Sequence, residues 1–163
     1  MLITLEGKRK TGKTTFILSA PSKICFFDFE GGLDRIEKIY FPPQDQLIIK
    51  SCLDISLVHK KTNPEQAMEQ WERLLTDYSE ALEDKDIKTI AFDTFTSVWE
   101  LRRLAYLAEL QKDDPTRTNL LPKEYFIPNA DMRMLLTQAS VHKKNLVVTH
   151  HLKEIYKDGK PSG

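Results

Sequence analysis

The sequence lacks several features that would point to a particular class of protein. It contains only two cysteines, Cys25 and Cys52, and their separation does not match the spacing of metal-binding cysteines. Cys25 lies in an apolar run, so we expect it to be a reduced core residue. There is no signal peptide, no apolar run long enough to cross a membrane, no repeat and no low-complexity tract. These absences predict a cytoplasmic protein without a membrane partner.

An excess of charge of one sign is also missing, which removes the global electrostatic signature of a nucleic-acid binder. The 163 residues carry 24 basic and 24 acidic side chains. The charge is nevertheless segregated: residues 1–14 and residues 141–163 each carry a net charge of +3, whereas residues 65–86 carry −6. The two basic ends could therefore share one face of the protein.

The apolar pattern predicts alternating strands and helices. Apolar runs are typical of strands at residues 1–6, 24–28, 46–51, 89–93 and 145–149. Helical spacing predicts helices at residues 63–85, 96–110 and 129–144, after a first helix that follows residue 13. Asn63 and Asn129 are the expected caps, and Trp71 and Tyr78 are expected in the core. The alternation favours one α/β domain over residues 1–163, with a mostly parallel sheet flanked by helices.

One motif near the start of the chain has a specific chemistry. Gly7, four further residues and then Gly12-Lys13-Thr14 match the pattern G-x-x-x-x-G-K-[ST], between an expected strand and an expected helix. Such a loop presents backbone N–H groups and a helix N-terminus to phosphate groups. Lys13 is placed to reach the β- and γ-phosphates, and the Thr14 hydroxyl to ligate Mg²⁺. The nucleotide-binding residues expected from the motif are Gly7, Lys8, Arg9, Lys10, Thr11, Gly12, Lys13, Thr14 and Thr15.

The same loop is unusually basic. The motif does not require positive charge at Lys8, Arg9 or Lys10. These three side chains are either solvated loop charges or contacts to nucleic acid or to a neighbouring subunit.

Acidic side chains stand where two expected strands end, and ligands of parallel sheets bind at such ends. Asp93 follows the apolar run "IAF" and is the expected Mg²⁺ partner of Thr14, with Thr94 as a supporting hydrogen-bond donor. Glu30 ends "FFDFE" and is the candidate for orienting the water that attacks the phosphate. Asp28 competes with Glu30 for this role, because side chains on a strand alternate between its two faces.

The order of the phosphate loop, "FFDFEGGLD", "IAFDT" and "VVTHHLK" resembles that of the RecA/RadA-like recombinase ATPases. The chain is most similar to the compact phage-encoded RecA-like ATPases that are linked to single-strand annealing and recombination. The resemblance extends over about residues 1 to 157. It implies a RecA-like P-loop NTPase core with the strand order 46–51, 24–28, 89–93, 145–149 and 1–6, which uses ATP and Mg²⁺.

The resemblance also implies roles for single residues. Glu30 matches the catalytic glutamate, and Asp34 matches an aspartate that approaches the adenine. His151, followed by Lys153, resembles a polar sensor that couples the γ-phosphate to a DNA-binding loop, although His150 could hold that place instead. With Lys13, these residues form the expected catalytic set of Lys13, Glu30 and His151. The expected DNA contacts are Lys112, Arg117, Lys123, Lys153, Lys157 and Lys160.

The function that follows is an ATPase of phage-type DNA recombination or annealing, in the cytoplasm of the host cell if the chain is phage-encoded. Its expected partners are ATP, single-stranded DNA, and a second copy or an annealing protein. A scaffold that binds ATP with little turnover and a P-loop small-molecule kinase are the alternatives. In the expected strand order, the strand at residues 1–6 is an unprotected edge, so we expect either a C-terminal truncation or a partner that covers it.

Overall fold

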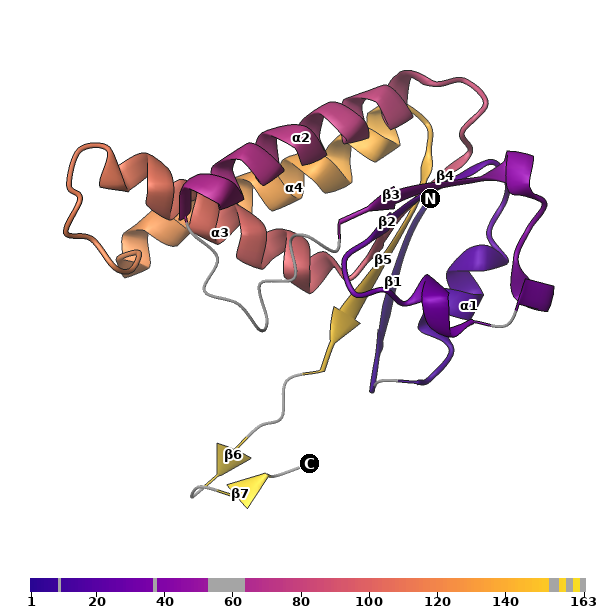
Figure 1. Cartoon of the computed structure of the whole chain (residues 1–163), viewed down its shortest axis with the longest axis horizontal. Coiled ribbons are helices and arrows are strands. Elements are labelled where there is room, and N and C mark those ends of the chain that lie inside the picture. Colours follow the sequence, from indigo (N-terminus) through magenta and orange to yellow (C-terminus); the bar gives the residue numbers. More distant parts are fainter. Residues whose placement is uncertain (9, 37, 53–63, 153–155, 158–159, 162–163) are drawn as a thin grey trace.

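The computed structural model of the chain describes residues 1–8, 10–36, 38–52, 64–152, 156–157 and 160–161 (Figure 1). Five parallel strands form one sheet in the order β1-β5-β4-β2-β3. They are β1 (Leu2–Gly7), β2 (Ile24–Asp28), β3 (Leu47–Ser51), β4 (Thr89–Asp93) and β5 (Asn145–His151). The predicted strand order and the α/β class are therefore confirmed.

Helices cover both faces of this sheet. The α-helices among the described residues are α1 (Lys13–Leu18), α2 (Pro64–Glu83), α3 (Phe95–Gln111) and α4 (Phe126–Val141). Short 3-10 helices are η1 (Leu33–Arg35), η2 (Lys38–Tyr40), η3 (Gln44–Gln46) and η5 (Pro122–Tyr125), and β6 (Tyr156–Lys157) pairs with β7 (Lys160–Pro161). Helices α2, α3 and α4 form a layer on one face, and α1 packs on the other (Figure 1). None of the described helices is both long and apolar enough to cross a membrane.

The register of the strands brings their carboxyl ends to one edge of the sheet. Asp28 at the end of β2 pairs with Asp93 at the end of β4, and Gly7 at the end of β1 pairs with His151 at the end of β5. Because the phosphate loop starts at Gly7, the chain that follows His151 leaves the sheet beside this loop. The two basic ends of the sequence therefore start from neighbouring strands.

Aromatic side chains fill the core between the sheet and the α2–α4 layer. The Phe92 ring stacks on Phe27 at 4.8 Å between centroids and lies 5.6 Å from Tyr78 and 5.7 Å from Phe95. Trp71 and Tyr78 are buried, as predicted from their helical spacing. The Tyr78 hydroxyl donates a hydrogen bond of 2.6 Å to the Leu135 carbonyl, which ties α2 to α4. Large apolar surfaces of this kind supply most of the free energy that favours folding.

Both cysteines belong to the core. Cys25 and Cys52 are buried and free, and burial raises the pKa of each thiol to about 12. Both side chains therefore stay protonated and behave as small apolar groups. This confirms the prediction for Cys25.

The predicted cap of the last helix is wrong. Helix α4 begins at Phe126, three residues before Asn129, and its first turn contains Pro128. Proline is tolerated there because the first N–H groups of a helix have no intrahelical acceptor. The Asn129 side chain instead accepts a hydrogen bond of 2.9 Å from Trp99 Nε1 of α3. The other predicted cap, Asn63, lies outside the described residues.

Phe92 offers a test of this core. Replacing Phe92 with alanine should lower the free energy of unfolding by about 3–5 kcal/mol, because a buried ring leaves a cavity among three aromatic neighbours. Urea unfolding followed by circular dichroism measures the change. The control is Phe126→Ala, since Phe126 is 64% exposed and its loss should change stability by less than about 0.5 kcal/mol. Equal unfolding midpoints for the two variants would contradict this description of the core.

Candidate functional site

Gly12 forms the junction between the loop after β1 and the start of α1. Gly12 immediately precedes α1 and has a φ of 84°, a conformation that glycine adopts without strain. Its carbonyl accepts a hydrogen bond of 2.9 Å from the Phe16 N–H, which starts the helix. The N-terminal end of α1 therefore faces the space that the loop encloses.

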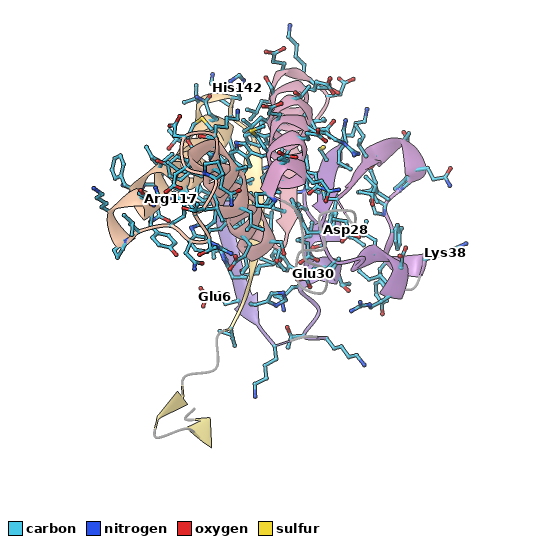
Figure 2. The ribbon with its side chains drawn as sticks, turned by 60° about the vertical axis from the view of Figure 1, so that its left-hand side comes forward. Glu6, Asp28, Glu30, Lys38, Arg117 and His142 are labelled. Atoms are coloured by element: carbon cyan, nitrogen blue, oxygen red, sulfur yellow. The ribbon has the colours of Figure 1, made fainter. Side chains whose placement is uncertain are left out.

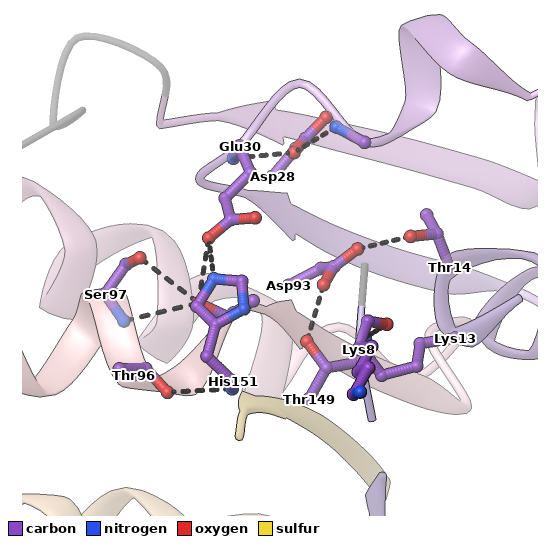
Figure 3. Close-up of polar contacts among 12 residues, drawn as sticks. Lys8, Lys13, Thr14, Asp28, Glu30, Asp93, Thr96, Ser97, Thr149 and His151 are labelled. Atoms are coloured by element: carbon purple, nitrogen blue, oxygen red, sulfur yellow. Dashed lines mark hydrogen bonds and ion pairs between the residues drawn. The ribbon is translucent and has the colours of Figure 1, made fainter. Parts of the chain in front are cut away.

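Lys13 is held inside this loop. Its ammonium donates hydrogen bonds of 2.8 Å to the Gly7 carbonyl and 2.9 Å to the Lys8 carbonyl (Figure 3). A lysine ammonium has three N–H donors, so a third can be offered to a phosphate oxygen. The loop thus fixes the position of a positive charge that nucleotide phosphates require.

Thr14 and Asp93 form the second part of the site. The Thr14 hydroxyl donates a hydrogen bond of 2.6 Å to Asp93 Oδ2, which joins α1 to the end of β4 (Figure 3). Gly32 lies so close that a Cβ atom there would be 3.1 Å from Asp93 Oδ2 and 3.2 Å from Thr14 Oγ1. The loop after β2 therefore closes over this hydroxyl–carboxylate pair.

These residues fit a magnesium ion. The described residues contain no group of three or more histidine, cysteine or acidic side chains that could hold a metal by themselves. Mg²⁺ is usually held by one or two protein oxygens, with phosphate oxygens and water completing its shell. The Thr14 hydroxyl can donate to Asp93 and still offer a lone pair to the ion.

Asp28 has a different role from its neighbour Glu30. Its buried carboxylate accepts hydrogen bonds from three backbone N–H groups, those of Glu30 and Gly32 at 3.1 Å and that of Leu33 at 3.4 Å. Asp28 therefore holds the loop that carries Gly32 over Thr14 and Asp93. Figure 3 shows Glu30 pointing away from Asp28, toward the end of β5. Of the two competing carboxylates, Glu30 is the one that lines the cavity.

The Glu30 carboxylate contacts His151 and Thr94. His151 Nε2 and Glu30 Oε1 form a hydrogen bond, and the Thr94 hydroxyl lies 3.4 Å from the same oxygen (Figure 3). The backbone N–H of His151 donates a hydrogen bond of 3.4 Å to the Thr96 hydroxyl, so the histidine is tied to the start of α3 as well. Thr94 also caps α3, since its side chain accepts from the Ser97 N–H.

The two neighbouring histidines face opposite ways. His150 packs edge-on against the Phe95 ring with a centroid distance of 5.9 Å, and it does not line the cavity. Burial lowers the pKa of His150, and the nearby Glu6 carboxylate opposes this effect. The side chain that reaches Glu30 is that of His151.

The phosphate loop, Glu30, Asp93 and His151 line one cavity of about 280 Å³. Its lining residues are Lys10, Thr11, Gly12, Lys13, Thr14, Thr15, Glu30, Gly32, Arg35, Ile36, Asp93, Thr94 and His151. Arg35 and Ile36 were missed by the sequence reasoning, because no motif covers them. Asp34 lies instead on a neighbouring cavity of about 820 Å³ that shares Ile36 with the first.

The expected DNA contacts Lys112, Arg117 and Lys123 lie away from this site. The segment 112–124 lies at the far end of the helical layer, and Figure 2 shows Arg117 well apart from Asp28 and Glu30. Arg117 forms an ion pair of 2.7 Å with Glu124, and the segment carries three basic and three acidic residues. Of the site residues expected from the sequence, Arg9 and Lys153 lie outside the described residues, as do the side chains of Lys157 and Lys160.

The comparisons with known proteins agree with this geometry. A family model described as an AAA domain matches residues 1–163, the whole chain. No curated protein matches the chain. The strand–loop–helix of β1 and α1, the carboxylate at the end of β4 and the all-parallel sheet are the parts that a P-loop ATPase needs. The chain therefore belongs to the AAA domain family of P-loop ATPases.

Proposed function

We propose that residues 1–163 form one domain that binds ATP with Mg²⁺ and hydrolyses it. One observation carries this proposal: a single cavity is lined by a lysine, a hydroxyl–carboxylate pair and a second carboxylate, all at the carboxyl ends of the strands. The lysine is Lys13, the pair is Thr14 with Asp93, and the second carboxylate is Glu30. These are the groups that phosphoryl transfer to water uses.

Each group has a separate task in this mechanism. The loop N–H groups and the Lys13 ammonium hold the phosphates and stabilise the negative charge that moves during transfer. Thr14 and Asp93 would hold Mg²⁺, which supplies further neutralisation of the transferring phosphoryl group. Glu30 orients and polarises the attacking water, because its carboxylate faces the same cavity as the phosphate loop.

His151 would link the γ-phosphate to the chain that follows β5. Its hydrogen bond to Glu30 holds the imidazole within the cavity, beside the phosphate loop. A γ-phosphate oxygen would offer a competing acceptor and would disappear on hydrolysis. The preferred conformation of the following residues would change with the nucleotide, as in other switches of the order–disorder kind.

The biological role that we propose is phage-type DNA recombination or single-strand annealing in the host-cell cytoplasm. It rests on the resemblance of the four motifs to RecA-like ATPases and on the pairing of β1 with β5, which starts both basic ends of the chain at one edge. Single-stranded DNA would meet Lys153, Lys157 and Lys160 rather than the charge-balanced segment 112–124. A second copy or an annealing protein would cover the free edge of β1.

The contacts of Arg102, Arg103 and Arg117 do not favour a small-molecule kinase, although Arg35 lines the cavity. A kinase needs arginines that are free to close over the transferred phosphoryl group. Arg102 is buried in ion pairs with Asp131 and Glu109, and it also lies over two aromatic rings. Arg103 and Arg117 are paired with acidic neighbours too. A nucleotide-dependent scaffold with little turnover remains the second candidate, because Glu30 is hydrogen-bonded to His151 and Thr94.

Lys13 tests the site as a whole. Lys13→Ala should reduce ATP turnover by at least about 10²–10³-fold, because one positioned donor to the transition state has an effect of this size. Phosphate release at saturating ATP measures it. Lys85→Ala, a change of an exposed lysine beyond the opposite end of the sheet, should leave turnover unchanged. Wild-type turnover in Lys13→Ala would show that the loop does not act on ATP.

Glu30 separates hydrolysis from binding. Glu30→Gln keeps the shape of the side chain but removes the charge that polarises water, so ATP affinity should persist while turnover falls. Calorimetric titration and phosphate release measure the two quantities on the same sample. The control is Glu72→Gln on the exposed side of α2. Unchanged turnover would exclude Glu30 from catalysis, and absent turnover in the wild type would favour the scaffold.

His151 tests the coupling to DNA. Wild-type protein should bind single-stranded DNA more tightly with a non-hydrolysable ATP analogue than without it, and its affinity should fall steeply with salt. His151→Ala should remove the nucleotide effect and keep ATP binding, whereas His142→Ala at the end of α4 should keep both. Fluorescence anisotropy at fixed salt measures the affinity. No nucleotide effect in the wild type contradicts the coupling.

A further inference from the structure

The end of β5 contacts both carboxylates of the site, Glu30 and Asp93. The contact with Asp93 has no role in the mechanism proposed for ATP hydrolysis. His151 contacts Glu30, and two residues earlier the Thr149 hydroxyl donates a hydrogen bond to Asp93 Oδ1 (Figure 3). Residues two apart on a strand share a face, so one strand presents both side chains to the same side of the sheet. Sequence reasoning gave Thr149 no role, although the residue lies within "VVTHHLK".

Thr149 leaves Asp93 with only one oxygen directed at the phosphate side. Asp93 is 5% exposed and Thr149 is 0% exposed, so their contact is closed to solvent. Asp93 Oδ1 accepts from Thr149, while Oδ2 accepts from Thr14 and lies against Gly32. The two hydroxyls donate to different oxygens of the carboxylate and thereby restrict its rotation.

The orientation of this carboxylate matters for the ion. Groups that hydrogen-bond to metal-binding side chains orient them, and their loss typically lowers metal affinity about 10–100-fold. Without Thr149, the Asp93 carboxylate could rotate about its last bond, and its buried Oδ1 would compete for the Thr14 hydroxyl. Thr14 would then be turned away from the phosphate side of the loop.

We propose that Thr149 is a positioning residue, which sets the affinity of the site for Mg²⁺ by fixing the Asp93 carboxylate. This inference rests on the proposed ATPase function. It adds β5 to the elements that prepare the metal site, besides α1, β4 and the loop after β2.

The experiment compares variants of the whole chain by the Mg²⁺ concentration that gives half-maximal binding of a fluorescent ATP analogue. Thr149→Val keeps the branched shape and removes the hydroxyl, and Thr149→Ser restores the hydroxyl. The matched control is Thr89→Val, because Thr89 is equally buried at the opposite end of the sheet and donates to the Pro21 carbonyl at 2.6 Å. Analogue binding in EDTA and the thermal unfolding midpoint are recorded for each protein.

Thr149→Val should raise the half-saturating Mg²⁺ concentration about 10–100-fold and leave binding in EDTA unchanged. Thr149→Ser should return this concentration to the wild-type value. Thr89→Val should lower the unfolding midpoint without changing the half-saturating Mg²⁺ concentration. If Thr149→Val shows no cooperative unfolding, Thr149→Ala takes its place with the same expectation.

Two results would overturn the inference. A wild-type Mg²⁺ dependence in Thr149→Val, with a lowered unfolding midpoint, would reduce Thr149 to a structural residue like Thr89. An equal shift in Thr89→Val would show that general destabilisation moves the Mg²⁺ dependence. A wild-type protein that binds no nucleotide in the presence of Mg²⁺ would instead contradict the ATPase function itself.

Discussion

A carboxylate that is buried at the end of a strand must find hydrogen-bond donors, and in this protein that constraint organises the whole site. Asp93 is nearly inaccessible to water, and an unpaired charge in such a place would be costly. Its donors come from α1 and β5, and the loop after β2 closes over it through Gly32. Three segments far apart in the sequence thus converge on one side chain. The cavity lies where they meet.

The strands and the central residues of the site could be predicted from local patterns, whereas the strand order was implied by the resemblance to RecA-like ATPases. Lys13 and Thr14 belong to a motif with fixed spacing, and Asp93 and Glu30 end apolar runs. All five residues of β2 and all five of β4 are buried, as expected for runs that are apolar on both faces. Because parallel strands align their carboxyl ends, the residues at those ends could be assigned to one edge.

Contacts between distant segments could not be predicted in the same way. Asn129 has the chemistry of a helix cap, but its partner is a tryptophan thirty residues earlier. Asp28 and Glu30 both carry a carboxylate, so the sequence does not tell them apart. Only the conformation of the loop after β2 shows that backbone N–H groups donate to Asp28. Thr149 is a common strand residue whose partner is known only once β4 and β5 are adjacent. Each of these contacts depends on tertiary structure.

The spacing of Thr149 and His151 makes the site sensitive to the alignment of β5. Side chains on a strand alternate, so a slip by one residue would turn Val148 and His150 toward the carboxylates. Asp93 would then face a methyl group instead of a hydroxyl, while His150 would take the place of His151 beside Glu30. Misaligned chains would still form a parallel sheet, but Asp93 would lack the donor that Thr149 supplies. The alignment of β5 with β4 therefore decides whether the buried Asp93 carboxylate meets a hydroxyl donor from this strand.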